Sequence, residues 1–282
     1  MIIVIDALNK KRYETILQET YRLRARVFRD RLDWDVQVHD GLEKDEFDAL
    51  DPAHVVSIDE DGNVVGCMRL LQTTGPHMLA DVFAKVLDGE PPLRDPQIWE
   101  ATRFCVDTER LTRKGRAKNS ISYVTSEVMV GAFEYGQKAG VLDAVAVIDP
   151  VMNRVMIRSG NAPYDYLGKT TDMGKVSVLA ALLDCSDERI QRIREFAGIE
   201  GNVFLEDEDV VPSPISARHD VAKPEREIHF HKQTASAEEA RPAKSHLEEY
   251  CDEQIAAAST EHERVAALRL KAALADKIGS HA

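Results

Sequence analysis

Hydrophobic positions follow two different spacings along most of this chain. Short apolar runs bounded by polar or glycine-containing segments are typical of strands, and apolar residues three or four apart are typical of helices. We expect strands at residues 1–6, 54–58, 64–71, 98–106, 142–148, 164–168 and 175–182. We expect helices at residues 10–29, 77–87, 120–139, 151–159 and 188–196.

The order of these elements predicts the fold class. Asp61-Gly62 separates the second and third strands, and this pair of residues is a strong signal for a tight hairpin. Strands then alternate with helices, which is the order of an α/β domain. We therefore expect one mixed, twisted sheet, antiparallel in its first half, with helices on both faces as an α-β-α sandwich.

The composition changes near residue 205. Four consecutive acids, Glu206–Asp209, precede the proline-containing segment Val210–Pro214, and few aromatic residues follow. Thr260 and Glu263 have the spacing of a capping box, which predicts a helix near the end of the chain. We expect a domain at residues 1–205 and, at 206–282, a linker and helical C-terminal extension with too few large apolar residues for a core of its own.

Charge and composition limit the partners of the chain. Its 282 residues carry a formal charge of −13, and phosphate binding needs a basic face, so a nucleic-acid partner is not expected. No apolar run is long enough for a membrane span or for the core of a signal peptide. The four cysteines lack the paired spacing of a disulfide framework or a zinc site, which favours a cytoplasmic protein with reduced thiols.

The segment from Phe28 to Asp48 is both acidic and aromatic. Its carboxylates include Asp33, Asp35, Asp40, Glu43, Asp45, Glu46 and Asp48. A solvated linker has no need for Trp34, and a hydrophobic core would not tolerate so many carboxylates. We expect this segment to receive a polar, cationic group.

Three charged residues interrupt strands that are rich in Val, Leu and Phe. Arg69 lies on one predicted strand, and Glu100 and Arg103 lie three apart on the next. Side chains three apart in a regular strand face opposite sides, so both reach one cleft only if a bulge or a splayed strand re-aims one of them. Taken singly, each charge is most simply a surface ion pair of little energy. Taken together, they predict partly buried charges that need partners.

These residues belong to a longer pattern. Its members in chain order are Arg24, Phe28, Trp34, Asp45, Asp48, Arg69, Phe83, Glu100 and Arg103. With the stretches GCMRLLQTT and WEATRFCVD, the pattern resembles the acyl-homoserine-lactone synthases, the LuxI-type autoinducer synthases, over about residues 1–200. The resemblance implies an acyltransferase (GNAT-like) fold. It also implies synthesis of an N-acyl-homoserine lactone, a quorum-sensing signal, from S-adenosylmethionine and an acyl thioester, with release of methylthioadenosine.

The resemblance implies a role for each charged residue. Glu100 is expected to take a proton from the ammonium of S-adenosylmethionine, directly or through a water. Arg24 or Arg103 would hold the methionine carboxylate, because a guanidinium matches a carboxylate with two parallel bonds. A backbone N–H at the splayed strand would stabilise the oxyanion. The residues expected to form a network with Arg103 that fixes the acidic segment and tunes Glu100 are Asp45, Asp48 and Arg69.

Aromatic and apolar residues complete the expected substrate site. Phe28 and Trp34 would offer ring faces to the adenosyl group or the sulfonium, and Phe83 is a further expected contact. S-adenosylmethionine is a substrate in this reading, and neither a cofactor nor a metal is needed.

The strand VLDAVAVID, residues 141–149, is expected to form one wall of the acyl pocket. Met152 and Met156 on the next helix would line it, since methionine fills irregular space. In the resembled family a threonine near the position of Ala146 commonly accompanies β-keto chains, and Ala146 offers no donor to a keto oxygen. We therefore expect an unsubstituted chain of medium or long length, unless Thr125 or Ser126 reaches that oxygen.

The most basic stretch lies just before the helix expected at 120–139. Its cationic residues include Arg110, Arg113, Lys114 and Arg116. Thr112, Gly115 and Ala117 have the spacing of a degenerate pyrophosphate loop of acetyltransferases, and such a loop at a helix N-terminus can bind phosphate. The stretch is expected to dock an acidic acyl-carrier protein or the phosphates of an acyl-coenzyme A, or to be a solvated loop; the sequence leaves these open.

Two other functions compete with the synthase. An acetyl-coenzyme A-dependent N-acetyltransferase on the same fold would leave Trp34 and the set of Arg, Asp and Glu residues without a role. A non-enzymatic binding protein would not need all of the signature residues to be present. The synthase is the function that we expect.

Overall fold

The computed structural model describes residues 1–114 and 121–205. The linker and helical extension expected at 206–282 lie outside the described residues, as do residues 115–120. The boundary expected at residue 205 therefore stays a prediction.

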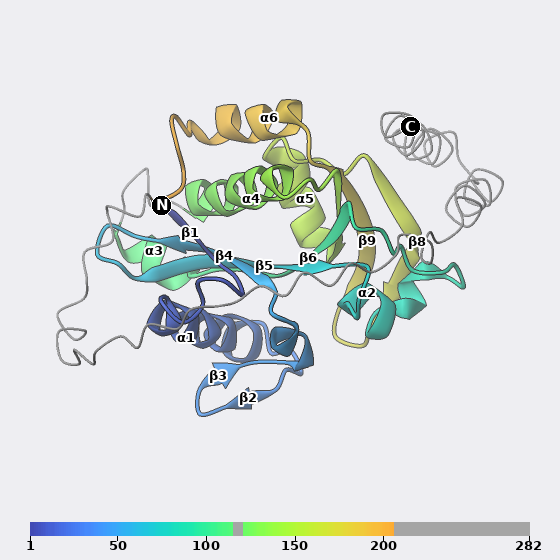
Figure 1. Cartoon of the computed structure of the whole chain (residues 1–282). Coiled ribbons are helices and arrows are strands. Elements are labelled where there is room, and N and C mark those ends of the chain that lie inside the picture. Colours follow the sequence, from blue (N-terminus) through green and yellow to red (C-terminus); the bar gives the residue numbers. More distant parts are fainter. Residues whose placement is uncertain (115–120, 206–282) are drawn as a thin grey trace, which may run out of the picture. The chain divides into compact units, whose positions relative to one another are not determined.

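A seven-stranded mixed sheet organises the described residues (Figure 1). Its strands are β1 (Ile2–Ile5), β4 (Ala53–Ile58), β5 (Val64–Gln72), β6 (Ile98–Val106), β7 (Asp143–Ile148), β8 (Asp165–Asp172) and β9 (Ser177–Asp184). They lie in the order β1-β4-β5-β6-β7-β9-β8. Every pair of neighbours is antiparallel except β6 and β7, which are parallel. The expected mixed sheet with an antiparallel first half is confirmed.

Helices cover both faces of the sheet, which confirms the expected sandwich (Figure 1). The α-helices are α1 (Glu14–Arg24), α2 (Met78–Asp81), α3 (Thr108–Lys114), α4 (Ile121–Lys138), α5 (Pro150–Arg158) and α6 (Asp187–Ala197). Helices α4 and α6 pack together on one face, and α1 packs against β5 from the other. A Cβ atom at Gly66 of β5 would lie 2.9 Å from a methyl group of Val124, so glycine is what lets α4 approach the sheet this closely.

The turn between β4 and β5 forms as the Asp-Gly pair predicted. Gly62 has a φ of +78°, a conformation that costs glycine little. The Asp59 carboxylate accepts hydrogen bonds from the backbone N–H groups of Asp61 and Asn63. The loop therefore supplies partners for its own backbone.

Two of the predicted helices are wrong in extent. The first begins at Glu14 rather than Lys10, and α1 continues as a π-helix over Ala25–Arg31. The helix expected at 77–87 is two short pieces, α2 and a 3₁₀ helix over Ala84–Leu87. The break at Phe83 lets its ring pack with the small cluster of Phe47, Leu71 and Met78, so tertiary packing overrides the helical pattern.

The acidic segment contains structure that the sequence analysis missed. Strands β2 (Val38–His39) and β3 (Leu42–Glu43) form a small hairpin around Asp40-Gly41, whose φ angles are both positive. A 3₁₀ helix, Glu46–Leu50, follows, and its capping box is formed by Asp45 and Asp48. The Asp-Gly signal used for the longer hairpin is present here too and could have revealed this one.

Among the described residues, no helix combines the length and apolar character needed to span a bilayer.

Candidate active site

Strands β6 and β7 separate at the centre of the sheet, beside the charged residues of β6. Parallel pairing of β6 with β7 runs from Ile98 to Glu100 and stops there. Between β5 and β6 the register shifts, so that Arg103 and Phe104 together lie opposite Met68. Arg103 has a φ of +53°, outside the usual strand region. This is a β-bulge, one of the two features that the spacing of Glu100 and Arg103 predicted, and it re-aims the Arg103 side chain.

Three arginines and three carboxylates form a closed ring of alternating charge beside the bulge. Around the ring the order is Arg24, Glu43, Arg103, Asp45, Arg69 and Asp48, which returns to Arg24. Arg103 Nε donates to Glu43 Oε1 at 3.1 Å, and its Nη2 donates to Asp45 Oδ2 at 2.6 Å. The ring is neutral overall, and each buried charge has an opposite charge on two sides, which offsets its desolvation.

The electrostatics of the ring follow from burial and pairing. Burial by itself would raise the pKa of Asp48, but the hydrogen bond from Arg24 lowers it well below its usual range. Arg24 shows the converse: burial opposes its charge, and bonds to Asp48 and Glu43 nevertheless raise its pKa. Three carboxylates of the acidic segment, Glu43, Asp45 and Asp48, are therefore paired with arginines of the chain itself. For these three carboxylates, the cations that the acidic segment was expected to receive are arginines of the chain itself.

Glu100 is a buried carboxylate that lines the cavity described below and is not part of this ring. Its side chain is 0% exposed, and its two oxygens accept the backbone N–H groups of Met78 at 2.7 Å and Leu79 at 2.6 Å. Burial raises the pKa of Glu100 to about 7, although these hydrogen bonds and the nearby Arg69 and Arg103 oppose the rise. A carboxylate with this pKa changes its charge near neutral pH, as a general base should.

Phe28 and Trp34 stack on each other at the edge of the site. Their ring centroids are 5.3 Å apart and the rings are 9° from parallel. Phe28 is buried in the π-helix and Trp34 is half-buried in the segment that follows. One face of each ring is already covered by the other, so a ligand would meet the remaining faces or edges.

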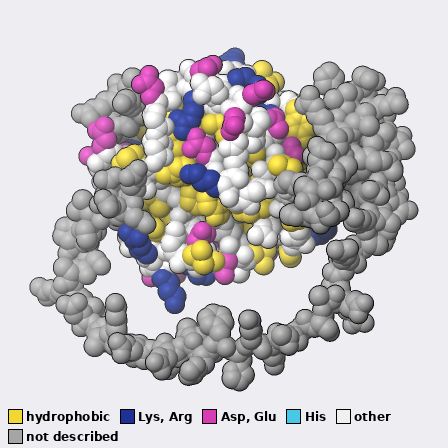
Figure 2. Space-filling model, turned by 45° about the horizontal axis from the view of Figure 1, so that its top comes forward, with side chains coloured by type: hydrophobic (Ala, Val, Ile, Leu, Met, Phe, Trp, Pro, Cys, Tyr) yellow, Lys and Arg dark blue, Asp and Glu magenta, His cyan; other side chains and the backbone are white. Residues whose placement is uncertain are grey.

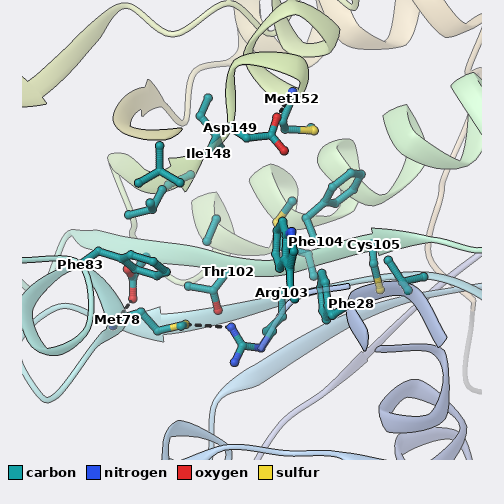
Figure 3. A pocket seen from close by; sticks show the side chains of 18 of the residues that line it. Phe28, Met78, Phe83, Thr102, Arg103, Phe104, Cys105, Ile148, Asp149 and Met152 are labelled. Atoms are coloured by element: carbon teal, nitrogen blue, oxygen red, sulfur yellow. Dashed lines mark hydrogen bonds between the residues drawn. The ribbon is translucent and has the colours of Figure 1, made fainter. Parts of the chain in front are cut away.

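A cavity of about 1030 Å³ connects these groups. Asp45, Glu100 and Arg103 line its polar part, whereas Met129 and Met152 belong to an apolar part between the sheet and helices α4 and α5. Figure 3 shows Met78 and Arg103 on one side of the cavity and Asp149 and Met152 on the other. The cavity thus offers a charged site continuous with an apolar channel.

The mouth of the cavity is also apolar. Large hydrophobic residues that line it and are nevertheless exposed include Leu32, Val82, Ile121, Val151 and Val155. Figure 2 shows hydrophobic side chains gathered across the middle of one face of the molecule, with charged side chains around them. Exposed apolar area of this kind commonly marks a binding site.

The structure brings most of the expected site residues to this cavity. Those that line it are Phe28, Trp34, Asp45, Phe83, Glu100, Arg103, Ala146 and Met152. Arg24, Asp48 and Arg69 are not part of the lining and lie behind it in the ring. Every nitrogen of the Arg24 guanidinium donates to Glu43 or Asp48, so Arg103 is the better placed of the two arginines proposed to hold a carboxylate.

Two residues of the site were not among the predicted ones. Glu43 is 0% exposed and bridges Arg24 to Arg103. The Met78 thioether accepts N–H groups of Arg69 at 3.2 Å and Arg103 at 3.3 Å, while its backbone N–H binds Glu100. The sequence contains Glu43 only as one acid among many, and Met78 carries no signal for this position.

The basic stretch is partly helical rather than a loop. Thr108–Lys114 form α3, which contains Arg110, Arg113 and Lys114, so the loop expected there is wrong for these residues. The half-exposed Arg110 lies 4.0 Å from the Asp107 carboxylate. Arg116 lies outside the described residues, as do Gly115 and Ala117 of the loop motif.

Comparison with known proteins assigns the family. The sequence model of the autoinducer synthases matches residues 9–193. The chain belongs to the autoinducer synthase family. This synthase is 39% identical over 160 residues to an acyl-homoserine-lactone synthase of Aeromonas hydrophila. The aligned stretch covers 56% of this chain and 75% of that protein. It is also 30% identical over 192 residues to an acyl-homoserine-lactone synthase of Agrobacterium fabrum, and this alignment covers 68% of this chain and 90% of that protein.

Solved structures agree with the fold and the family. LasI, an acyl-homoserine-lactone synthase, has a TM-score of 0.60 and 30% identity to this synthase, covering 69% of this chain and 94% of its own. BjaI, described as coenzyme A-dependent and solved with S-adenosylmethionine and isopentyl-CoA, has a TM-score of 0.62 and 25% identity, covering 71% and 90%. The expected family is confirmed, and the protein is an acyltransferase that forms acyl-homoserine lactones.

Proposed function

We propose that this synthase joins the amino group of S-adenosylmethionine to an acyl chain and then closes the lactone, with both substrates bound in the cavity of about 1030 Å³. The observation that carries the proposal is the position of Glu100. A carboxylate with a pKa near 7 lies in the same cavity as an aromatic stack, a cavity-facing arginine and an apolar channel.

The S-adenosylmethionine end is assigned to the polar part of the cavity. Arg103 is held by Glu43 and Asp45 through two of its nitrogens, while Nη1 has only the Met78 thioether, a weak acceptor. Nη1 is therefore available to the methionine carboxylate. The exposed side of the Phe28–Trp34 stack would contact the adenosyl group.

The chemistry needs a base, an oxyanion site and alignment. Glu100 takes a proton from the ammonium, directly or through a water, and the free amine attacks the thioester carbonyl. The bulge at Arg103 leaves one β6 residue without a ladder partner, and we assign its backbone N–H to the developing oxyanion. The amide forms as the thiol leaves. The methionine carboxylate then attacks its own γ-carbon, and methylthioadenosine departs as a neutral thioether.

The acyl donor is proposed to be an acyl-coenzyme A. BjaI and MesI, two similar solved synthases, are both described as coenzyme A-dependent, at 25% and 26% identity. An acyl-carrier protein docked on the basic residues around α3 is the second donor to test. We also propose a cytoplasmic location, where both substrates are available.

The test is turnover with defined substrates. Purified full-length protein is incubated with S-adenosylmethionine and with acyl-coenzyme A or acyl-carrier protein thioesters, and the extract is analysed by mass spectrometry. An acyl-homoserine lactone and an equal amount of methylthioadenosine are expected. Acylation of another amine, with S-adenosylmethionine left intact, would support the acetyltransferase alternative instead.

A further inference from the structure

The apolar channel runs along helix α4 beside the reaction centre. On α4 its lining recurs on one helical face at Thr125, Met129, Ala132, Phe133 and Gly136. The start of α4 lies beside the end of β6, since a Cβ atom at Gly66, which pairs with Val106, would lie 2.9 Å from Val124. The end of α4 lies beside the start of β6, where the ring centroids of Trp99 and Tyr135 are 6.2 Å apart. Helix α4 therefore runs antiparallel to β6, and the channel passes from the level of the bulge toward the start of that strand.

Small side chains keep the channel open between the sheet and α4. They are Ala101 on β6, Ala132 and Gly136 on α4, and Ala144 and Ala146 on β7. At the far end, a Cβ atom on Gly136 would lie 3.5 Å from the Val141 Cβ and 3.9 Å from the Cys185 Sγ, both of which also line the cavity. A side chain larger than alanine at position 136 would therefore occupy space in the channel.

The length of this channel sets a scale for the acyl group. From Thr125 to Gly136 the helix advances roughly 16 Å. An extended chain advances roughly 1.2 Å per bond, because three backbone bonds span about 3.6 Å. The volume of about 1030 Å³ also lies at the top of the range of roughly 300–1,000 Å³ for small-molecule sites, which leaves room for a second substrate.

We propose that the acyl donor of this synthase carries a long chain, of about twelve to fourteen carbons at roughly 1.2 Å per bond, and that Gly136 sets the upper limit of its length. The proposal rests on the proposed function, since it places the acyl chain in the channel beside α4. Met129, Met152 and Met156 adapt to the chain, because their side chains are flexible and apolar.

The test measures kcat/KM for a series of unsubstituted acyl-coenzyme A donors from four to sixteen carbons at fixed S-adenosylmethionine. We expect kcat/KM to rise about two- to fourfold per methylene and to level off at about twelve to fourteen carbons. A maximum at eight carbons or fewer would overturn the chain-length proposal. If none of the donors yields a lactone, the proposed function itself would be rejected.

Substitution at the far end separates a length limit from general damage. Gly136→Leu should lower kcat/KM for the fourteen-carbon donor at least tenfold and leave the six-carbon donor within about twofold. Gly136→Ala fits the contacts and should give the same trend with a smaller change, so it serves if the leucine variant does not fold. Ala139→Leu, an exposed position near the same helix end, is the control and should change neither donor. An equal loss at every chain length in both Gly136 variants would refute the role of Gly136.

Discussion

Replacing Glu100 by glutamine tests the proposed base with little change in shape. Both carboxylate oxygens accept backbone N–H groups, from Met78 and Leu79. The glutamine amide keeps one acceptor oxygen and turns an NH₂ group toward the other N–H. The variant therefore loses one buried hydrogen bond, at a cost of about 1–3 kcal/mol, and it loses the ability to take a proton.

The raised pKa makes this substitution pH-dependent in a defined direction. Burial raises the pKa of Glu100 from 4.5 to about 7 in the folded protein, which corresponds to roughly 3 kcal/mol. Because the folded pKa is the higher one, the stability contributed by protonated Glu100 is fully present below pH 4.5 and is lost as pH rises through about 7. Between pH 4 and 8, wild-type stability should therefore fall relative to Glu100→Gln by roughly 3 kcal/mol.

Activity should change in the opposite direction with pH. Wild-type kcat/KM should rise through about pH 7 and then level off, because the ionised form of Glu100 is the base. Glu100→Gln should lower kcat/KM about a hundredfold or more and remove that rise. The free-amine fraction of S-adenosylmethionine also increases with pH, so the wild-type profile is compared with that of the variant rather than read alone.

The assay combines steady-state turnover with urea unfolding at matched pH values. Glu46→Gln is the matched control, since Glu46 is an exposed carboxylate that lines the same cavity. That variant should keep wild-type turnover and pH dependence. Near-normal turnover by folded Glu100→Gln, or an unchanged pH profile, would refute the assignment of Glu100 as the base.

Three further predictions concern the substrates. Arg103→Lys should lower kcat/KM about a hundredfold, because lysine cannot serve Glu43, Asp45 and the substrate carboxylate together; turnover within tenfold of wild type would contradict this. Trp34→Ala should raise the Kd for S-adenosylmethionine about three- to tenfold by calorimetry and leave the acyl donor unaffected, since it removes the stack on Phe28; equal effects on both substrates would count against an adenosyl role. Unsubstituted donors should be preferred to β-keto donors of the same length by about tenfold in direct competition, because Ala146 offers no donor. Thr125 lines the cavity and Ser126 is not part of its lining, so a β-keto preference that Thr125→Val abolishes would assign the missing donor to Thr125.

Local signals in the sequence were enough for the strands and for the type of chemistry. Apolar runs bounded by turn signals placed every strand of the main sheet, because strands such as β4 and β5 are buried along almost their whole length. The spacing of Glu100 and Arg103 predicted a bulge or a splayed strand, since a regular strand cannot aim both side chains into one cleft, and the structure has the bulge. The signature residues identified the family because they combine the charges and aromatics that its reaction needs.

Tertiary structure decided which charges meet each other and which meet a substrate. Arg24 and Arg103 are equivalent as arginines in the sequence and both belong to the ring, yet only Arg103 also lines the cavity. Ion pairing depends on distances between residues far apart in the chain, such as Glu43 and Arg103, and on how much water each group has lost. The pKa of Glu100, the break at Phe83 and the length of the channel beside α4 all arise from packing between elements, which local patterns do not record.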